Sequence, residues 1–261
     1  MPRFAADCPH VKTEINFADV WGIGDLLVVS SASKIRHKLL ARFRYYRHPE
    51  MLDLWGGPFN GQSFRQLMYL DLANSCSFEA IVETGTFRGS TTRFLAENSG
   101  GAPVYSCEYS PVNFEFAKWR LRGSQNLLLF NLDSREFIRE LKISRQARTF
   151  FYLDAHWGAD LPLQEELDLI FQNFENFVVM IDDFEVPNDP GYQVDDYGPG
   201  KRLSPRDFPL HRDTRIACYF PARAASQESG LKRGAIVLAS LGLKGHLDAI
   251  DSLVPAASVL D

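Results

Sequence analysis

The stretch "EAIVETGTFRGSTTRFLAEN", residues 79–98, joins an apolar run to a helical pattern through a turn that contains two glycines. The run over 79–85 predicts a short buried strand, and "STTRFLAEN" predicts the helix that follows it. Gly85 and Gly89 allow the backbone to turn tightly and to approach a ligand closely. The helix that begins near Ser90 presents free backbone N–H groups, which favour an anion. The stretch therefore predicts a strand, a ligand-binding turn and a helix.

The alternation of strand and helix continues along the chain. Strand-like runs followed by helical patterns lie at 103–110, 126–134 and 149–155, and a fifth strand is expected at 176–183. This spacing predicts a parallel, doubly wound sheet with helices on both faces. Two later runs, "TRIACYF" and "GAIVLAS", are close enough to form an antiparallel pair at one edge. The expected fold class is α/β, with a mostly parallel, Rossmann-like sheet, an antiparallel edge strand and an N-terminal helical cap.

The chain divides into three expected regions. Residues 1–75 form the helical cap, residues 76–245 form the core, and residues 246–261 form a C-terminal tail. The core contains a Gly/Pro/Asp-rich loop, 184–204, which is long enough to act as a lid over a bound ligand. The acidic residues of this loop could extend a nearby site or simply be solvated: Glu185, Asp189, Asp195 and Asp196.

Composition excludes several classes of protein. The chain has 261 residues, of which 45% are hydrophobic and 23% charged, as in an ordinary globular domain with an appendage. Its net charge of -5 argues against a general nucleic-acid binder. The four cysteines show no CxxC spacing, which favours reduced thiols in a cytoplasmic protein. No stretch approaches the ~20 apolar residues of a membrane span, so a soluble protein without stable membrane insertion is expected.

The later strand ends carry further candidate binding residues. Glu108 ends the second strand, where an acidic side chain commonly accepts hydrogen bonds from both hydroxyls of a ribose. Asp133 and Ser134 end the third strand, where they are placed to touch a base or, alternatively, to cap the following helix. Together with the glycine turn, these positions form a pattern typical of an adenosine site.

Three aspartates end the fourth and fifth strands. Asp154 closes "FFYL", and Asp182 with Asp183 closes "FVVMI", so neighbouring strands would bring three carboxylates to one rim. Unpaired carboxylates raise one another's pKa and destabilise the fold, which favours a bound cation. An all-oxygen set favours Mg²⁺, Mn²⁺ or Ca²⁺ over zinc. The alternative is that these aspartates only begin polar turns.

His156 and Trp157 follow the fourth strand. His156 is a candidate general base or hydrogen-bond donor to a metal ligand, although a lone loop histidine is often structural. Trp157 either lines a ligand pocket or packs in the core.

A basic segment lies in the expected cap. "SKIRHKLLARFRYYRH", residues 33–48, has no acidic residue, and an apolar stripe runs through it. The basic residues are Lys34, Arg36, Lys38, Arg42, Arg44 and Arg47. One interpretation is an amphipathic helix that packs on the domain and leaves a basic face in solvent. The other is a binding site for a phosphorylated or carboxylated substrate, or for a membrane surface.

The motifs together resemble a known family. "VETGTFRGST", "SCEYS", "YLDAHW" and "IDDF", in this order and spacing, resemble the class I S-adenosylmethionine-dependent methyltransferases. Within them, the chain is similar to the metal-dependent O-methyltransferases typified by catechol O-methyltransferase and the macrocin-type sugar methyltransferases. The resemblance covers residues 79–240, roughly the expected core.

The resemblance implies a role for each matched residue. The motif ExGxxxG, here Glu83, Gly85 and Gly89, would hold the methionine part of the cofactor, and Glu108 would bind the ribose. The implied cofactor-binding set is Glu83, Gly85, Thr86, Gly89, Ser90, Thr91, Glu108, Asp133, Ser134 and Asp154. The implied metal ligands are Asp154, Asp182 and Asp183, and the implied catalytic residues are His156 and Asp154. Because Gly158 replaces the lysine of catechol-type enzymes, His156 is the leading candidate for the base.

The resemblance implies a magnesium- or manganese-assisted transferase that methylates a hydroxyl of a small molecule such as a sugar, a polyketide or a catechol. No nucleic-acid partner is expected, and a homo-oligomer is compatible with the sequence. Two other classes stay open: a metal-dependent hydroxylase or nucleotide-sugar enzyme on a similar fold, and a non-catalytic S-adenosylmethionine-binding protein.

Overall fold

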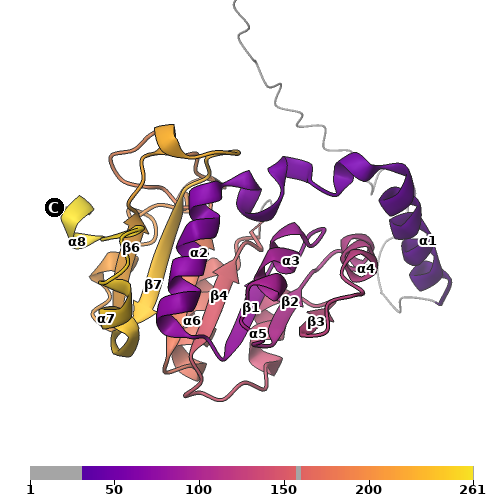
Figure 1. Cartoon of the computed structure of the whole chain (residues 1–261), viewed down its shortest axis with the longest axis horizontal. Coiled ribbons are helices and arrows are strands. Elements are labelled where there is room, and N and C mark those ends of the chain that lie inside the picture. Colours follow the sequence, from indigo (N-terminus) through magenta and orange to yellow (C-terminus); the bar gives the residue numbers. More distant parts are fainter. Residues whose placement is uncertain (1–30, 157–159, 261) are drawn as a thin grey trace, which may run out of the picture.

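An eight-stranded mixed sheet forms the centre of the computed structural model, which describes residues 31–156 and 160–260 (Figure 1). The strand order is β3-β2-β1-β4-β5-β7-β6-β8. The strands are β1 (Ala80–Thr84), β2 (Val104–Cys107), β3 (Leu127–Phe130), β4 (Thr149–Leu153), β5 (Phe177–Asp182), β6 (Ile216–Pro221), β7 (Ala235–Ser240) and β8 (Leu253–Pro255). β1 to β5 are parallel, and the remaining strands pair antiparallel. The predicted Rossmann-like sheet is confirmed.

Helices cover both faces of this sheet. They are α1 (Ser31–Arg47), α2 (Ser63–Cys76), α3 (Ser90–Glu97), α4 (Pro111–Arg120), α5 (Ser134–Glu140), α6 (Leu163–Asn173), α7 (Lys244–Leu247) and α8 (Ala257–Leu260). Apolar residues of α5 and α6 share one core cluster with the sheet, whereas α2, α3 and α7 contribute to the other. β1, β4 and β5 are therefore buried at every position, as central strands covered on both faces must be.

The N-terminal part of the described chain is helical, as predicted. α1 is followed by the short 3-10 turns η1 (Pro49–Met51), η2 (Leu54–Gly56) and η3 (Pro58–Gly61), which lead into α2. Residues 1–30 of the expected cap, and Trp157 and Gly158, lie outside the described residues. Within the described ranges, no helix is long and apolar enough to cross a membrane.

The C-terminal side of the sheet differs in detail from the prediction. β7 lies between β5 and β6, so the predicted antiparallel pair is not itself the edge. The edge strand is β8, which lies in the segment expected to be a tail and pairs with β6. A three-residue strand carries too short a pattern for sequence periodicity to reveal.

The strand order creates a switch point in the sheet. β1 pairs with β2 on one side and with β4 on the other, so the strand order reverses between β1 and β4. In open α/β sheets, ligands bind at such a switch point, outside the carboxyl ends of the strands. The loops that follow β1, β2, β4 and β5 meet there.

Candidate active site

A cavity of about 980 Å³ lies at this switch point. It is lined by residues of the segments that follow the five parallel strands, including Gly85, Glu108, Asp133, Asp154 and Asp183. The segment between α1 and α2 adds Leu54, Trp55 and Asn60, and the loop between β5 and β6 adds Gln193, Asp195 and Tyr197. Strand ends therefore form its floor, and two loops form its walls.

The turn between β1 and α3 has the tight geometry that its glycines predict. Gly85 has a φ of +88°, and a Cβ there would collide with the carbonyl oxygen of Asp154. Its backbone N–H and that of Thr86 both donate to the carbonyl oxygen of Cys107, at 3.0 and 2.9 Å. Of the expected contacts in this turn, Gly85, Thr86, Ser90 and Thr91 line the cavity. Gly89 does not, and an added Cβ there would instead meet Leu121.

Glu83 does not line the cavity, contrary to the expectation for its motif. It is 1% exposed, and its carboxylate accepts hydrogen bonds from the hydroxyls of Thr92 and Ser106, each at 2.5 Å. Burial raises the pKa of Glu83 to about 7, although the two hydroxyls oppose the shift. Glu83 thus joins β1 to β2 and to the first turn of α3, behind the cavity wall.

Glu108 lines the cavity directly after β2. Its two carboxylate oxygens accept from the backbone N–H groups of Phe87 and Ser110, at 2.7 and 2.8 Å. Burial raises the pKa of Glu108, and these two N–H groups partly offset the effect. The hydrogen bonds fix the carboxylate in one orientation beside the β1–α3 turn.

Asp133 and Ser134 line the cavity beyond β3. Asp133 is also the N-cap of α5, because its side chain accepts from the Arg135 N–H at 2.9 Å and pairs with the Arg135 guanidinium. Asp133 therefore caps α5 through its hydrogen bonds, and it also lines the cavity.

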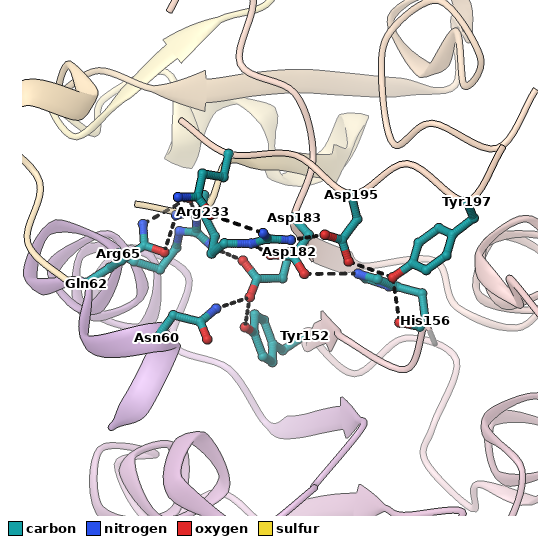
Figure 2. Close-up of polar contacts among 11 residues, drawn as sticks. Asn60, Gln62, Arg65, Tyr152, His156, Asp182, Asp183, Asp195, Tyr197 and Arg233 are labelled. Carbon is teal, nitrogen blue, oxygen red and sulfur yellow. Dashed lines mark hydrogen bonds and ion pairs between the residues drawn. The ribbon is translucent and has the colours of Figure 1, made fainter. Parts of the chain in front are cut away.

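Of the three aspartates expected as metal ligands, Asp154 and Asp183 line the cavity and Asp182 does not. Asp182 is fully buried, and it accepts hydrogen bonds from Arg65, from Asn60 at 3.0 Å and from the Tyr152 hydroxyl at 2.7 Å (Figure 2). Burial alone would raise its pKa, but the charge of Arg65 and the bond from Tyr152 hold the pKa below its ordinary value. β5 ends at Asp182, and only Asp183 of the pair, which follows with a φ of +57°, lines the cavity.

A different trio comes together instead. One ligand atom from each of Asp154, His156 and Asp183 lies within 4.8 Å of the others. His156 is 3% exposed, and neither ring nitrogen has a hydrogen-bond partner among the described residues, although Nε2 lies 3.8 Å from Asp183 Oδ2. Burial, with the charges of Asp182 and Asp183, raises the pKa of Asp154 well above its ordinary value. Two carboxylates and an imidazole without a hydrogen-bond partner among the described residues form a donor set that fits a divalent cation.

A chain of hydrogen bonds braces this trio through the loop 184–204. Arg233 Nε donates to Asp183 Oδ1 at 2.5 Å, and its guanidinium also pairs with Asp195 (Figure 2). The Tyr197 hydroxyl lies 2.6 Å from Asp195 Oδ2 and 2.8 Å from the carbonyl oxygen of His156. Among the acidic residues expected to extend the site, Asp195 is the one that lines the cavity. The loop therefore touches the ends of both β4 and β5.

Sequence reasoning missed Arg65, Arg233, Asn60 and Tyr197. Arg65 and Asn60 come from the N-terminal helical region, and Arg233 directly precedes β7, so tertiary packing brings them to the site. The run "LWGGPFNG" did carry a signal, since its glycines indicate tight turns close to a ligand. In the structure, Trp55 of this run stacks on Phe87 with ring centroids 5.0 Å apart.

The strand order and the position of the cavity define the class I S-adenosylmethionine-dependent methyltransferase fold. Three solved structures have a similar fold. An O-methyltransferase from Bacillus cereus in complex with SAH is 17% identical, with a TM-score of 0.50, and the match covers 86% of this chain and 95% of that one. The cofactor-bound Rv0187 from MTB is 16% identical, with a TM-score of 0.53 and coverages of 87% and 94%.

A provisionally assigned caffeoyl-CoA O-methyltransferase from Staphylococcus aureus is 12% identical, with a TM-score of 0.55 and coverages of 79% and 99%. At these identities the likeness shows the fold. Neither a protein-family model nor a curated protein matches the sequence.

Proposed function

We propose that this chain is an S-adenosylmethionine-dependent O-methyltransferase that uses a divalent cation to methylate a hydroxyl of a small molecule. The observation that carries the proposal is that one cavity contains both the ribose-type carboxylate, Glu108, and the cation-type trio Asp154, His156 and Asp183. A methyl donor and an activated hydroxyl must meet in one enclosed space, and this cavity provides it. The SAH-bound and cofactor-bound neighbours of the same fold support the cofactor assignment.

The residues present fit the cofactor. Gly85, Thr86, Ser90 and Thr91 would surround its methionine end, Glu108 would accept the ribose hydroxyls, and Asp133 with Ser134 would lie beside the base. The fixed Glu108 carboxylate is the best-defined part of this set, because two backbone N–H groups orient it. When bound, S-adenosylmethionine supplies a methyl group on a positively charged sulfur.

The donor set favours Mn²⁺ over Mg²⁺, because an imidazole joins the two carboxylates. When bound, the cation lowers the pKa of a coordinated hydroxyl. His156 is thereby proposed as a ligand and not as the base expected from the sequence. Asp182 is proposed to act from outside the ligand set: with Arg65 it forms a buried ion pair beneath the site.

The chain's own residues position the reacting groups and exclude water. Phe87, with Trp55 stacked on it, lines one side of the cavity, whereas Tyr197 and Gln193 line the side near the trio. A positively charged methyl donor and an anionic oxygen would attract each other, so alignment and exclusion of water are the protein's main contributions.

A transfer assay tests the proposal. Protein stripped with EDTA is mixed with methyl-labelled S-adenosylmethionine and a panel of sugars, polyketides and catechols. We expect label in one class of hydroxyl compound, only after Mn²⁺ or Mg²⁺ is restored. Transfer that is equally fast in EDTA would contradict the cation, and tight binding of the cofactor without transfer to any hydroxyl compound would contradict the methyltransferase activity.

A further inference from the structure

α1 lies at one end of the molecule, beyond α4 (Figure 1). It is attached to α4 by aromatic contacts: Tyr45 packs against Phe116 with ring centroids 5.6 Å apart, and Tyr46 packs against Trp119 at 6.1 Å. The Arg42 guanidinium lies over the Trp119 ring at 4.3 Å. These contacts come from the C-terminal half of α1 and leave other side chains of the helix largely exposed.

Three of these exposed side chains form an apolar stripe. Ile35, Leu39 and Phe43 are 57%, 63% and 54% exposed, and their spacing of four residues places them along one line of the helix. An amphipathic helix that packs its apolar stripe on the domain would bury such residues, whereas here more than half of each side chain is exposed. Exposed apolar patches rimmed by polar residues mark interaction sites.

The stripe is bordered by positive charge on both sides. α1 contains six Lys and Arg residues and no Asp or Glu, although the whole chain has a net charge of -5. By helical periodicity, Lys34 and Lys38 lie along one border and Arg36 and Arg47 lie along the other. Lys118, exposed in the last turn of α4, adds to the charge at this end. The partner of this surface must therefore be both apolar and negatively charged.

We infer that the outer face of α1 docks on an anionic lipid bilayer. An apolar stripe with flanking Lys and Arg is the pattern of a helix that lies in the plane of a membrane interface, with its apolar residues between the acyl chains and its cations at the headgroups. A nucleic acid would use the cations but not the stripe. A symmetric contact between two copies of α1 would place two sets of positive charges against each other.

Docking of α1 would hold the cavity rim near the membrane. α1 continues through η1 into Leu54 and Trp55, which line the cavity and are 37% and 41% exposed. The enzyme would thus be a peripheral protein, attached through one helix.

Vesicle co-sedimentation of the full chain tests the inference, and it needs neither cofactor nor acceptor. We expect binding to vesicles of phosphatidylcholine with phosphatidylglycerol, weak binding to phosphatidylcholine alone, and loss of binding at high salt. Lys34→Glu with Lys38→Glu should lower the partition coefficient at least tenfold, as should Leu39→Ser with Phe43→Ser. The matched control, Arg139→Glu with Lys142→Glu at the end of α5, makes the same change in net charge at exposed positions and should bind normally.

Three results would overturn it. Equal binding of the control and the α1 variants would show that net charge, not α1, governs binding. Light scattering that shows a dimer, split by Leu39→Ser with Phe43→Ser, would assign the face to a second copy of the chain. Binding to duplex DNA or RNA that is tighter than binding to anionic vesicles would assign it to nucleic acid.

Discussion

Arg233 donates from Nε to Asp183 Oδ1 at 2.5 Å, while Oδ2 of the same carboxylate faces His156 Nε2 at 3.8 Å. The arginine is itself fixed, because Gln62 accepts from its backbone N–H and donates to its carbonyl oxygen, both at 2.9 Å. Oδ1 of Asp183 therefore accepts from a guanidinium that is fixed in place, and Oδ2 stays available for the proposed cation. Arg233 acts as a positioning residue for a proposed ligand.

Replacement of Arg233 tests this positioning. In Arg233→Met, Asp183 loses its guanidinium partner and can rotate, so we expect Mn²⁺ affinity to fall about 10- to 100-fold, with a parallel loss of turnover. SAH affinity should change little, because Glu108 and the β1–α3 turn are untouched. Arg202→Met is the matched control, since Arg202 pairs with Glu185 and Asp196 of the same loop outside the cavity. Unchanged Mn²⁺ affinity in Arg233→Met would remove the positioning role.

Replacement of His156 distinguishes a role as metal ligand from a role as general base. If His156 is a metal ligand, His156→Ala should lower both Mn²⁺ affinity and turnover. If His156 is a general base, His156→Ala should lower turnover by ~10² to 10⁴ and leave Mn²⁺ affinity intact. We expect the first result, because both ring nitrogens lack hydrogen-bond partners among the described residues and the ring lies between two carboxylates. Titration of Mn²⁺ followed by electron paramagnetic resonance, together with initial rates, distinguishes the two.

Gly85 should tolerate no side chain. Gly85→Ala would bring a Cβ against the Asp154 carbonyl oxygen in addition to the strain of a positive φ, so it should lose both stability and SAH binding. Gly100→Ala is the control, because Gly100 has a φ of +65° but open space around it. The free energy of unfolding of Gly100→Ala should fall only by the conformational cost of a positive φ, about 1 to 2 kcal/mol. Equal unfolding free energies for the two variants, measured by urea denaturation, would show that the close approach is unimportant.

Glu83 should make stability depend on pH. Its pKa is higher in the folded protein, about 7, than in the unfolded chain, so ionisation disfavours the folded state as pH rises from ~4.5 through ~7. In Glu83→Gln this penalty is absent. The unfolding free energy of the variant relative to wild type should therefore rise by up to about 3 kcal/mol between pH ~5 and ~8. Exposed Glu140→Gln is the control, and a flat difference for Glu83→Gln would contradict the burial argument.

The sequence predicted the parts of the fold that local patterns determine. Short apolar runs predict the five parallel strands. The two glycines at Gly85 and Gly89 predict the tight turn after the first strand. The sequence also predicts that Asp154 and Asp183 lie at one edge, because parallel strands deliver their ends there, and both line the cavity. Asp182, expected in the same ligand set, is instead hydrogen-bonded to Arg65, Asn60 and Tyr152 and does not line the cavity.

The rest depends on contacts between distant segments. Arg65 reaches Asp182 from α2, and Arg233 reaches Asp183 from the turn before β7, so no short-range pattern links either pair. The positive charges of these two arginines offset part of the negative charge of the aspartates, which the sequence alone left unpaired. Tyr197 likewise reaches the site because its loop folds back over the end of β4.

Calorimetric titration of S-adenosylhomocysteine into the full chain tests the central claim most directly. The account predicts one site per chain, and it predicts that Glu108→Ala weakens binding at least tenfold, because a charged acceptor of hydrogen bonds is worth about 1.5 to 3 kcal/mol for each bond. Glu115→Ala on α4, outside the cavity lining, should bind like wild type. Absence of binding, equal binding by Glu108→Ala, or preferred binding of NAD would contradict the assignment of this cavity to S-adenosylmethionine.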